Sequence, residues 1–142
     1  MLPQMIATFC AALFAGAAVY INVVEHPARM ALGPATALAQ WAPSYQRATL
    51  MQAPLALIGA TAGVVAWATG GHMVWLIGAL LLGAVIPITL LVILPTNKRL
   101  QALPPAAADA GTRHTIKTWA RLHLVRDAAG LLATAAYLWA DH

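Results

Sequence analysis

Charged residues are scarce in this sequence. Only 8% of its 142 residues are Asp, Glu, Lys or Arg, whereas 61% are hydrophobic. A soluble domain carries about 25% charged residues, so the composition excludes an ordinary soluble domain and indicates a membrane protein. Cysteine is scarcer still, and the single Cys10 excludes an internal disulfide framework or a cysteine-rich metal site. The length predicts one domain over residues 1–142.

The few charges are mostly basic, which gives a formal net charge of +4. These basic residues flank apolar segments and form no stripe with interleaved aromatic residues. They therefore indicate membrane topology, with the lipid bilayer as partner, and no binding of nucleic acid.

Long charge-free segments predict transmembrane helices. A helix needs about 20 apolar residues to cross a bilayer, and neither residues 5–24 nor residues 48–97 carry a formal charge. Gly70-Gly71 divides the second segment. A fourth span is expected although its first turns are charged, because bundle helices hold polar groups on inward faces. We predict an all-α, four-helix transmembrane bundle, up-down-up-down, with spans at about residues 5–26, 45–69, 73–95 and 118–140.

The basic residues also predict an orientation. All eight Lys and Arg lie in or beside the connections at residues 27–43 and 95–117. Both connections are therefore expected in the cytoplasm and both termini on the extracytoplasmic side. The first connection is expected to hold a short interfacial helix. The expected location is a cell membrane crossed several times, such as a bacterial inner membrane.

Polar residues gather at the predicted cytoplasmic ends of the spans. On the first span, one helical face at 100° per residue holds Asn22, Glu25, His26 and Arg29. A charge that faces lipid costs at least about 2.5 kcal/mol, so this face is expected to point into the bundle.

The fourth span has a matching polar face made of Trp119, His123 and Arg126. Asp127 lies one turn beyond His123 and is in position to orient its imidazole. The two faces together predict a polar pocket between the first and fourth helices.

These residues are candidates for chemistry. The catalytic candidates are His26, His123, Glu25 and Arg126. The candidates for substrate binding are Asn22, Arg47, Gln52, Asn97 and Trp119.

Three functions fit this set. An oxidoreductase would use a histidine or carboxylate to remove a proton from a small aromatic or quinone-like substrate, and Arg, Asn or Gln donors to stabilise the enolate. A redox protein would ligate haem, copper or iron through His26 and His123, with Glu25 or Asp127 as a further metal ligand. A non-enzymatic membrane subunit would use the same residues as a buried network.

Four segments resemble the motifs of the anthrone-oxygenase-like membrane proteins, in order along the chain. They are residues 20–28 with Asn22-Val23-Val24-Glu25-His26-Pro27, residues 45–54 with Tyr45-Gln46-Arg47 and Gln52-Ala53-Pro54, residues 95–100 with Pro-x-Asn-x-x-Leu, and residues 119–126 with Trp-x-x-x-His-x-x-Arg. The motif positions are Asn22, Glu25, His26, Arg47, Gln52, Asn97, Trp119, His123 and Arg126.

The resemblance implies four helices and, from the fungal members with assigned roles, oxidation of an anthrone to an anthraquinone without flavin or nicotinamide. We therefore expect an integral membrane oxygenase, of the monooxygenase type, for a small hydrophobic substrate. No cofactor is required by this expectation, and haem, copper or iron belongs to the alternative. Faces rich in Ala and Gly permit association into a homo-oligomer.

Overall fold

The structure is a computed structural model and describes residues 1–140. It confirms the all-α prediction of four long helices, here called rods. The first rod joins α1 (Leu2–Tyr20), the π-helix η1 (Ile21–Glu25) and α2 (His26–Met30), and the second is α3 (Pro34–Ala68). The third joins α4 (Met73–Ile88), the π-helix η2 (Thr89–Ile93) and α5 (Leu94–Gln101), and the fourth is α6 (Ala110–Ala140), preceded by the 3-10 turn η3 (Pro105–Ala107).

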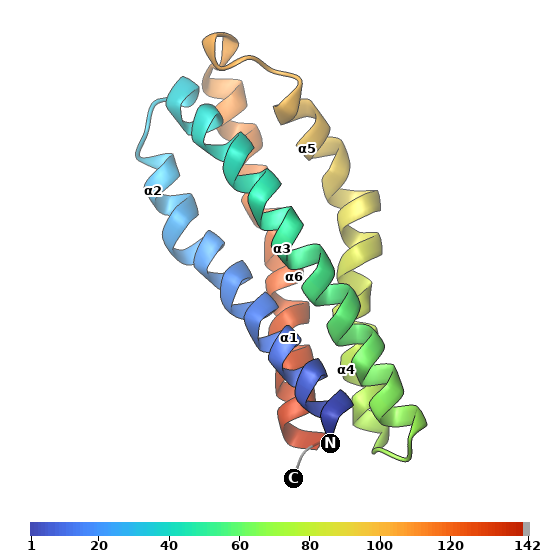
Figure 1. The fold of residues 1–142 in the computed structure, drawn as a ribbon. Helices are drawn as coiled ribbons and strands as arrows, with labels where there is room; N and C mark the ends of the chain where they lie inside the picture. The colour runs from blue at the N-terminus through green and yellow to red at the C-terminus, as the bar shows by residue number, and fades with distance from the viewer. Residues whose placement is uncertain (141–142) are drawn as a thin grey trace.

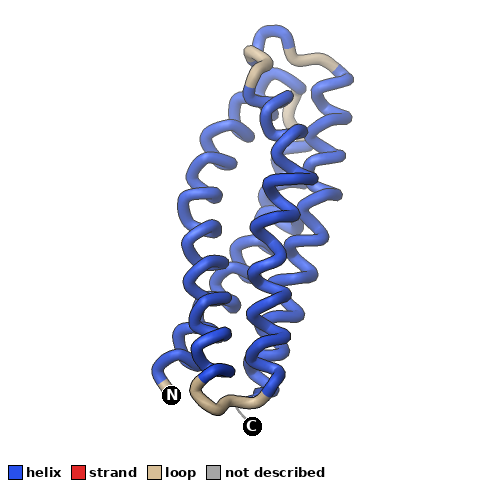
Figure 2. The backbone as a smooth tube through the Cα atoms, turned by 90° about the vertical axis from the view of Figure 1, so that its right-hand side faces the viewer, coloured by secondary structure: helices blue, strands red, loops and turns tan. Residues whose placement is uncertain are grey.

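The rods form a four-membered bundle. α1 packs on α3 and α6, and α4 packs on the same two helices. The start of α1 and the end of α6 lie at one end of the bundle, and the connections after α2 and α5 lie together at the other end (Figure 1). The loops are confined to these two ends (Figure 2).

Three of the rods are long and apolar enough to cross a membrane by length and composition: Leu2–Met30, Pro34–Ala68 and Met73–Gln101. Large apolar side chains such as Phe9, Leu57 and Leu80 are exposed on them, as expected for helices that face lipid. Among residues 1–140, α6 does not reach this standard, because charged residues occupy the middle of its sequence. It packs along α1 and α4 nonetheless.

The rods extend beyond the predicted spans, and the expected interfacial helix is absent from the described chain. α2 continues to Met30 and α3 begins at Pro34, so the connection is only residues 31–33. Gly33 is extended and Pro34 starts the helix, where its missing N–H is not needed. Residues 34–43 therefore form the first turns of α3.

This extension changes where the polar residues lie. One apolar cluster, built around Phe14, Leu82 and Tyr137, fills the half of the bundle near the termini. A second cluster, built around Trp41, Ile93 and Trp119, fills the half near the connections. The polar side chains, here called the polar layer, lie in the half of the bundle near the connections, where Trp119 of the second cluster donates to Asn97 and Arg126 donates to Gln52.

Both π-helices border this layer, and each ends two residues before a proline. The His26 N–H donates to the Ile21 carbonyl in η1, and the Leu94 N–H donates to the Thr89 carbonyl in η2. A proline ring clashes with the carbonyl four residues earlier, so widening the preceding turn accommodates Pro27 and Pro95. Because a π-turn holds an extra residue, the faces that follow it are rotated relative to those before it.

Candidate functional site

Asn97 joins three rods at the centre of the polar layer. The Trp119 Nε1–H on α6 donates to Asn97 Oδ1 at 2.8 Å, and Asn97 Nδ2 donates to the Tyr45 hydroxyl on α3 at 3.0 Å. Asn97 is 0% exposed. Trp41 stacks on the Tyr45 ring at 5.1 Å and meets Trp119 edge-on at 5.8 Å. Both ends of the Asn97 amide are therefore used to hold aromatic side chains.

His123 follows Trp119 by one turn of α6 and is held in one tautomer. Its Nδ1 is 2.9 Å from the Trp119 carbonyl oxygen. A carbonyl only accepts, so Nδ1 carries the proton and the lone pair is on Nε2. The imidazole also packs on the Trp119 ring, with centroids 4.0 Å apart. This arrangement leaves Nε2 of a buried, oriented histidine as an acceptor.

Asp127 does not orient His123, and that expectation is wrong. Asp127 Oδ2 instead accepts from Asn22 Nδ2 at 2.5 Å, and its Oδ1 has no partner within residues 1–140. The Trp119 carbonyl, one turn before His123 on the same helix, takes the orienting role.

Arg126 and Gln52 pair across the bundle. Arg126 Nη2 donates to Gln52 Oε1 at 2.9 Å. Within the described chain, Gln52 Nε2 and Arg126 Nε are buried and have no hydrogen-bond partner. Because native proteins seldom bury unpaired donors, this pair is suited to bind an oxygen atom of a ligand.

A cavity of about 160 Å³ lies beside this pair, between α3 and the third rod. Its lining is mostly apolar, from residues such as Ala53, Val85 and Leu90, with Gln52 and Arg126 among its polar members. A second hollow of about 10 Å³ shares Tyr45, Thr49, Gln52 and Arg126 with it and adds Trp119 and His123. That is close to the volume that one water needs.

This chain matches the model of the anthrone oxygenase family over residues 41–136, more than half of its length. It belongs to the anthrone oxygenase family. No curated protein and no solved structure matches it.

The family match covers most of the polar layer. It includes Gln52, Asn97, Trp119, His123 and Arg126. It begins downstream of Asn22, Glu25 and His26, which belong to the first rod. The match thus covers the part of the layer contributed by α3, α5 and α6.

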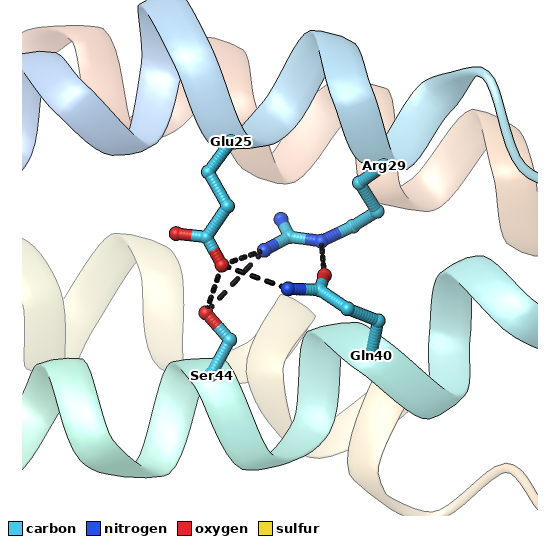
Figure 3. A network of polar contacts seen from close by, with 4 residues as sticks. All are labelled: Glu25, Arg29, Gln40 and Ser44. Carbon is cyan, nitrogen blue, oxygen red and sulfur yellow. Dashed lines mark hydrogen bonds and ion pairs between the residues drawn. The ribbon is translucent and has the colours of Figure 1, made fainter.

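Glu25 takes part in a separate network with three neighbours (Figure 3). Its Oε1 accepts from Arg29 Nη2 at 2.8 Å, from Gln40 Nε2 at 2.9 Å and from the Ser44 hydroxyl. The Arg29 Nε donates to Gln40 Oε1. This network fastens α2 to α3, while its arginine lies 5.7 Å from the Trp119 ring.

Gln40 and Ser44 were not predicted. Arg29 is 2% exposed, which agrees with its place on the inward-facing polar face of the first span, although it was also counted among the cationic residues beside the first connection. Glu25 and Arg29 are four residues apart, a spacing that favours an ion pair on a helix. Gln40 and Ser44 lie upstream of the predicted second span, so nothing in the sequence marked them as members of a buried network.

His26 and His123 line different hollows, and Arg47 lines neither of the two. His26 lines a hollow on the α6 side of the first rod with Lys117 and Arg121. Arg47 is exposed on α3. Residues 1–140 contain no group of three or more His, Cys, Asp or Glu side chains able to hold a metal ion. The predicted metal set of His26, His123 and a carboxylate therefore does not fit this geometry.

Proposed function

We propose that this protein is an integral membrane oxidoreductase that oxidises a small, planar, anthrone-like aromatic with dioxygen in the cavity between α3 and the third rod. The single observation that carries the proposal is the pair of buried, unpartnered donors on Gln52 and Arg126 beside an apolar cavity. The apolar lining suits the rings, and the two donors suit the carbonyl oxygen.

The reaction needs a base and a stabilised enolate. His123 Nε2 removes a proton from the methylene carbon opposite the carbonyl, through one water in the small hollow. Electron density moves to the carbonyl oxygen, which the N–H groups of Gln52 and Arg126 bind as it becomes negative.

The resulting carbanion reduces dioxygen and forms a carbon–oxygen bond to it. Loss of one water from the hydroperoxide leaves the second carbonyl. One anthrone and one dioxygen thus give one anthraquinone and one water, and no other oxidant or reductant is consumed. Asn97 and Trp119 act as positioning residues, because they hold the helix turn whose carbonyl orients His123.

The catalytic set of this proposal is narrower than the one suggested by the sequence. It keeps His123 and Arg126 as catalytic residues and Gln52 as a substrate-binding residue. Glu25, whose Oε1 is already engaged three times, is assigned to holding Arg29 and α3 in place.

We further propose that the polar layer lies toward the cytoplasmic side. The basic residues lie in the helices that flank the connections after α2 and α5, and these two connections lie at the same end of the bundle (Figure 1). The positive-inside rule favours this orientation, with both termini on the extracytoplasmic side.

The test uses purified protein in detergent, anthrone and air-saturated buffer. Anthraquinone formation is followed by absorbance and dioxygen uptake with an electrode, and a ratio of one to one is expected. His123→Ala should lower the rate by about 10²-fold or more. His114→Ala changes an exposed histidine of the same helix and should leave the rate unchanged. A wild-type rate equal to the uncatalysed one, or full activity of His123→Ala, would overturn the proposal.

A further inference from the structure

A hollow of about 390 Å³ lies on the other side of α6 from the oxidation cavity, between α6 and the end of the first rod. Its polar lining is Asn22 and His26 from the first rod and Lys117 and Arg121 from α6. It shares no lining residue with the oxidation cavity, and the proposed function gives it no role.

The charge of this hollow is of one sign. Lys117 and Arg121 are one turn apart on α6 and are both exposed. Its described lining contains no Asp or Glu. The two nearest carboxylates along the first rod and α6 are already engaged, Glu25 by Arg29 and Asp127 by Asn22. An anion therefore meets two cations in the lining, while the Asp127 carboxylate lies behind Asn22, which donates to it.

His26 adds a hydrogen-bonding group. It lines the hollow from the first rod, which faces the two cations of α6. A phosphate oxygen bound to Lys117 and Arg121 would therefore have an imidazole beside it.

The surroundings of the hollow are apolar. Leu124 is part of its lining, and Val23, Val24 and Val125 are exposed near it along the two rods. A free phosphate has no use for such a surface, whereas the acyl chains of a phospholipid do.

We propose that this hollow binds the phosphate of an anionic phospholipid, with Lys117, Arg121 and His26 on the headgroup and the exposed valines and Leu124 against the acyl chains. The composition of α6 alone does not mark it as a membrane span. A bound lipid would place a negative headgroup against its cations and acyl chains against its apolar neighbours. Basic hollows between transmembrane helices are suited to headgroups at the membrane surface.

The test is native mass spectrometry of the full chain in detergent, with phosphatidylglycerol and phosphatidylcholine of identical acyl chains as probes. The wild-type chain should retain phosphatidylglycerol and release phosphatidylcholine. Because one cation near an anionic surface contributes roughly fivefold in affinity, the double variant Lys117→Gln/Arg121→Gln should bind phosphatidylglycerol about 30-fold more weakly.

The matched control is Lys98→Gln/Arg99→Gln, which removes two exposed cations from α5 at the same end of the bundle. It should lower phosphatidylglycerol binding less than about threefold. Equal losses in both double variants would show general surface attraction and overturn the site. Equal retention of the two lipids by the wild-type chain would do the same without any variant. Displacement of the lipid by millimolar inorganic phosphate would assign the hollow to a free anion and overturn the lipid proposal.

Discussion

Arg126 donates a hydrogen bond of 2.9 Å to Gln52 across the bundle, and each of the two residues keeps a second buried N–H group without a partner in the described chain. The two residues come from α6 and α3, and they meet where the apolar cavity is most polar. Ligand binding and folding can therefore be tested separately at Gln52. One substitution removes its unpartnered N–H donor but keeps the oxygen that accepts from Arg126.

Gln52→Glu is that substitution. The carboxylate still accepts from Arg126, so the variant should fold with a thermal midpoint close to that of the wild type. The Nε2 donor is lost and the new charge opposes a developing enolate, so the rate of anthrone oxidation should fall by about 10²-fold.

Gln52→Leu gives the complementary result. It leaves Arg126 buried without its acceptor, which should lower both the thermal midpoint and the rate. If Gln52→Glu keeps full activity, the two donors do not bind the substrate.

The Trp119–Asn97–Tyr45 chain should act as a unit. Trp119→Phe and Tyr45→Phe each leave one end of the buried Asn97 amide unpaired. Each should destabilise the protein by about 1 kcal/mol, which is the usual scale inside membranes. The double variant should lose less than the sum of the two, as measured by thermal or denaturant unfolding in detergent. Trp139→Phe, at a residue 62% exposed, should leave stability unchanged, and additive losses would argue against a coupled network.

Tyr137 packs so closely on Gly78 that no side chain fits between them. A Cβ on Gly78 would lie 2.5 Å from a ring carbon of Tyr137, whereas a Cβ on Gly16 meets nothing within 4 Å. Gly78→Ala should therefore destabilise the bundle by about 1–3 kcal/mol. Gly16→Ala, also within a helix, should be neutral or slightly stabilising. Unfolding of both variants in detergent checks this prediction. Equal stability of the two variants would mean that α4 and α6 can move apart to admit the new methyl group without loss of stability.

The start of α6 should respond to acid. Asp109 Oδ1 accepts from the Thr112 N–H at 2.9 Å, and Thr112 Oγ1 in turn accepts from the Asp109 N–H at 3.2 Å. The hydrogen bonds from Thr112 lower the pKa of the Asp109 carboxyl below its usual value. The folded state binds this proton more weakly than the unfolded state. The cap therefore contributes its stability above a pH of about 4 and loses it as the pH falls further.

Hydrogen exchange of the first turn of α6 measures the effect. At neutral pH, Asp109→Ala should exchange faster than the wild type, and the difference should shrink progressively as the pH falls below about 4. Asp109→Asn keeps the acceptor without titrating, so its protection should stay constant with pH. A wild-type protection that does not change with pH would contradict the assignment.

Reporter fusions test the orientation. A reporter placed after His142, which lies outside the described residues, should score as extracytoplasmic. One placed in the connection near Pro105 should score as cytoplasmic. The opposite pattern would place the polar layer toward the other side of the membrane, although it would leave the chemistry of the layer unchanged.

The sequence by itself determined the helices and singled out most of the polar residues that form hydrogen bonds between them. Apolar segments without charge must be helical in lipid, because every backbone group has to find a partner within the segment. The rarity of charge made the few polar side chains conspicuous, and the hydrogen-bonded layer contains Asn22, Glu25, Gln52, Asn97, Trp119, His123 and Arg126, all of them candidates from the sequence.

Only the tertiary structure decided which of these residues meet. A uniform 100° per residue places Asn22 and Glu25 on one face, but η1 widens the turn between them. Asn22 therefore contacts Asp127 on α6, whereas Glu25 contacts Gln40 and Ser44 on α3. Hydropathy likewise ends a span where polar residues begin, while the helices continue past them and bury part of the layer among the residues of the second apolar cluster. Pairing depends on helix phase and on neighbours distant in the chain, and neither is encoded in the local pattern of polar and apolar residues.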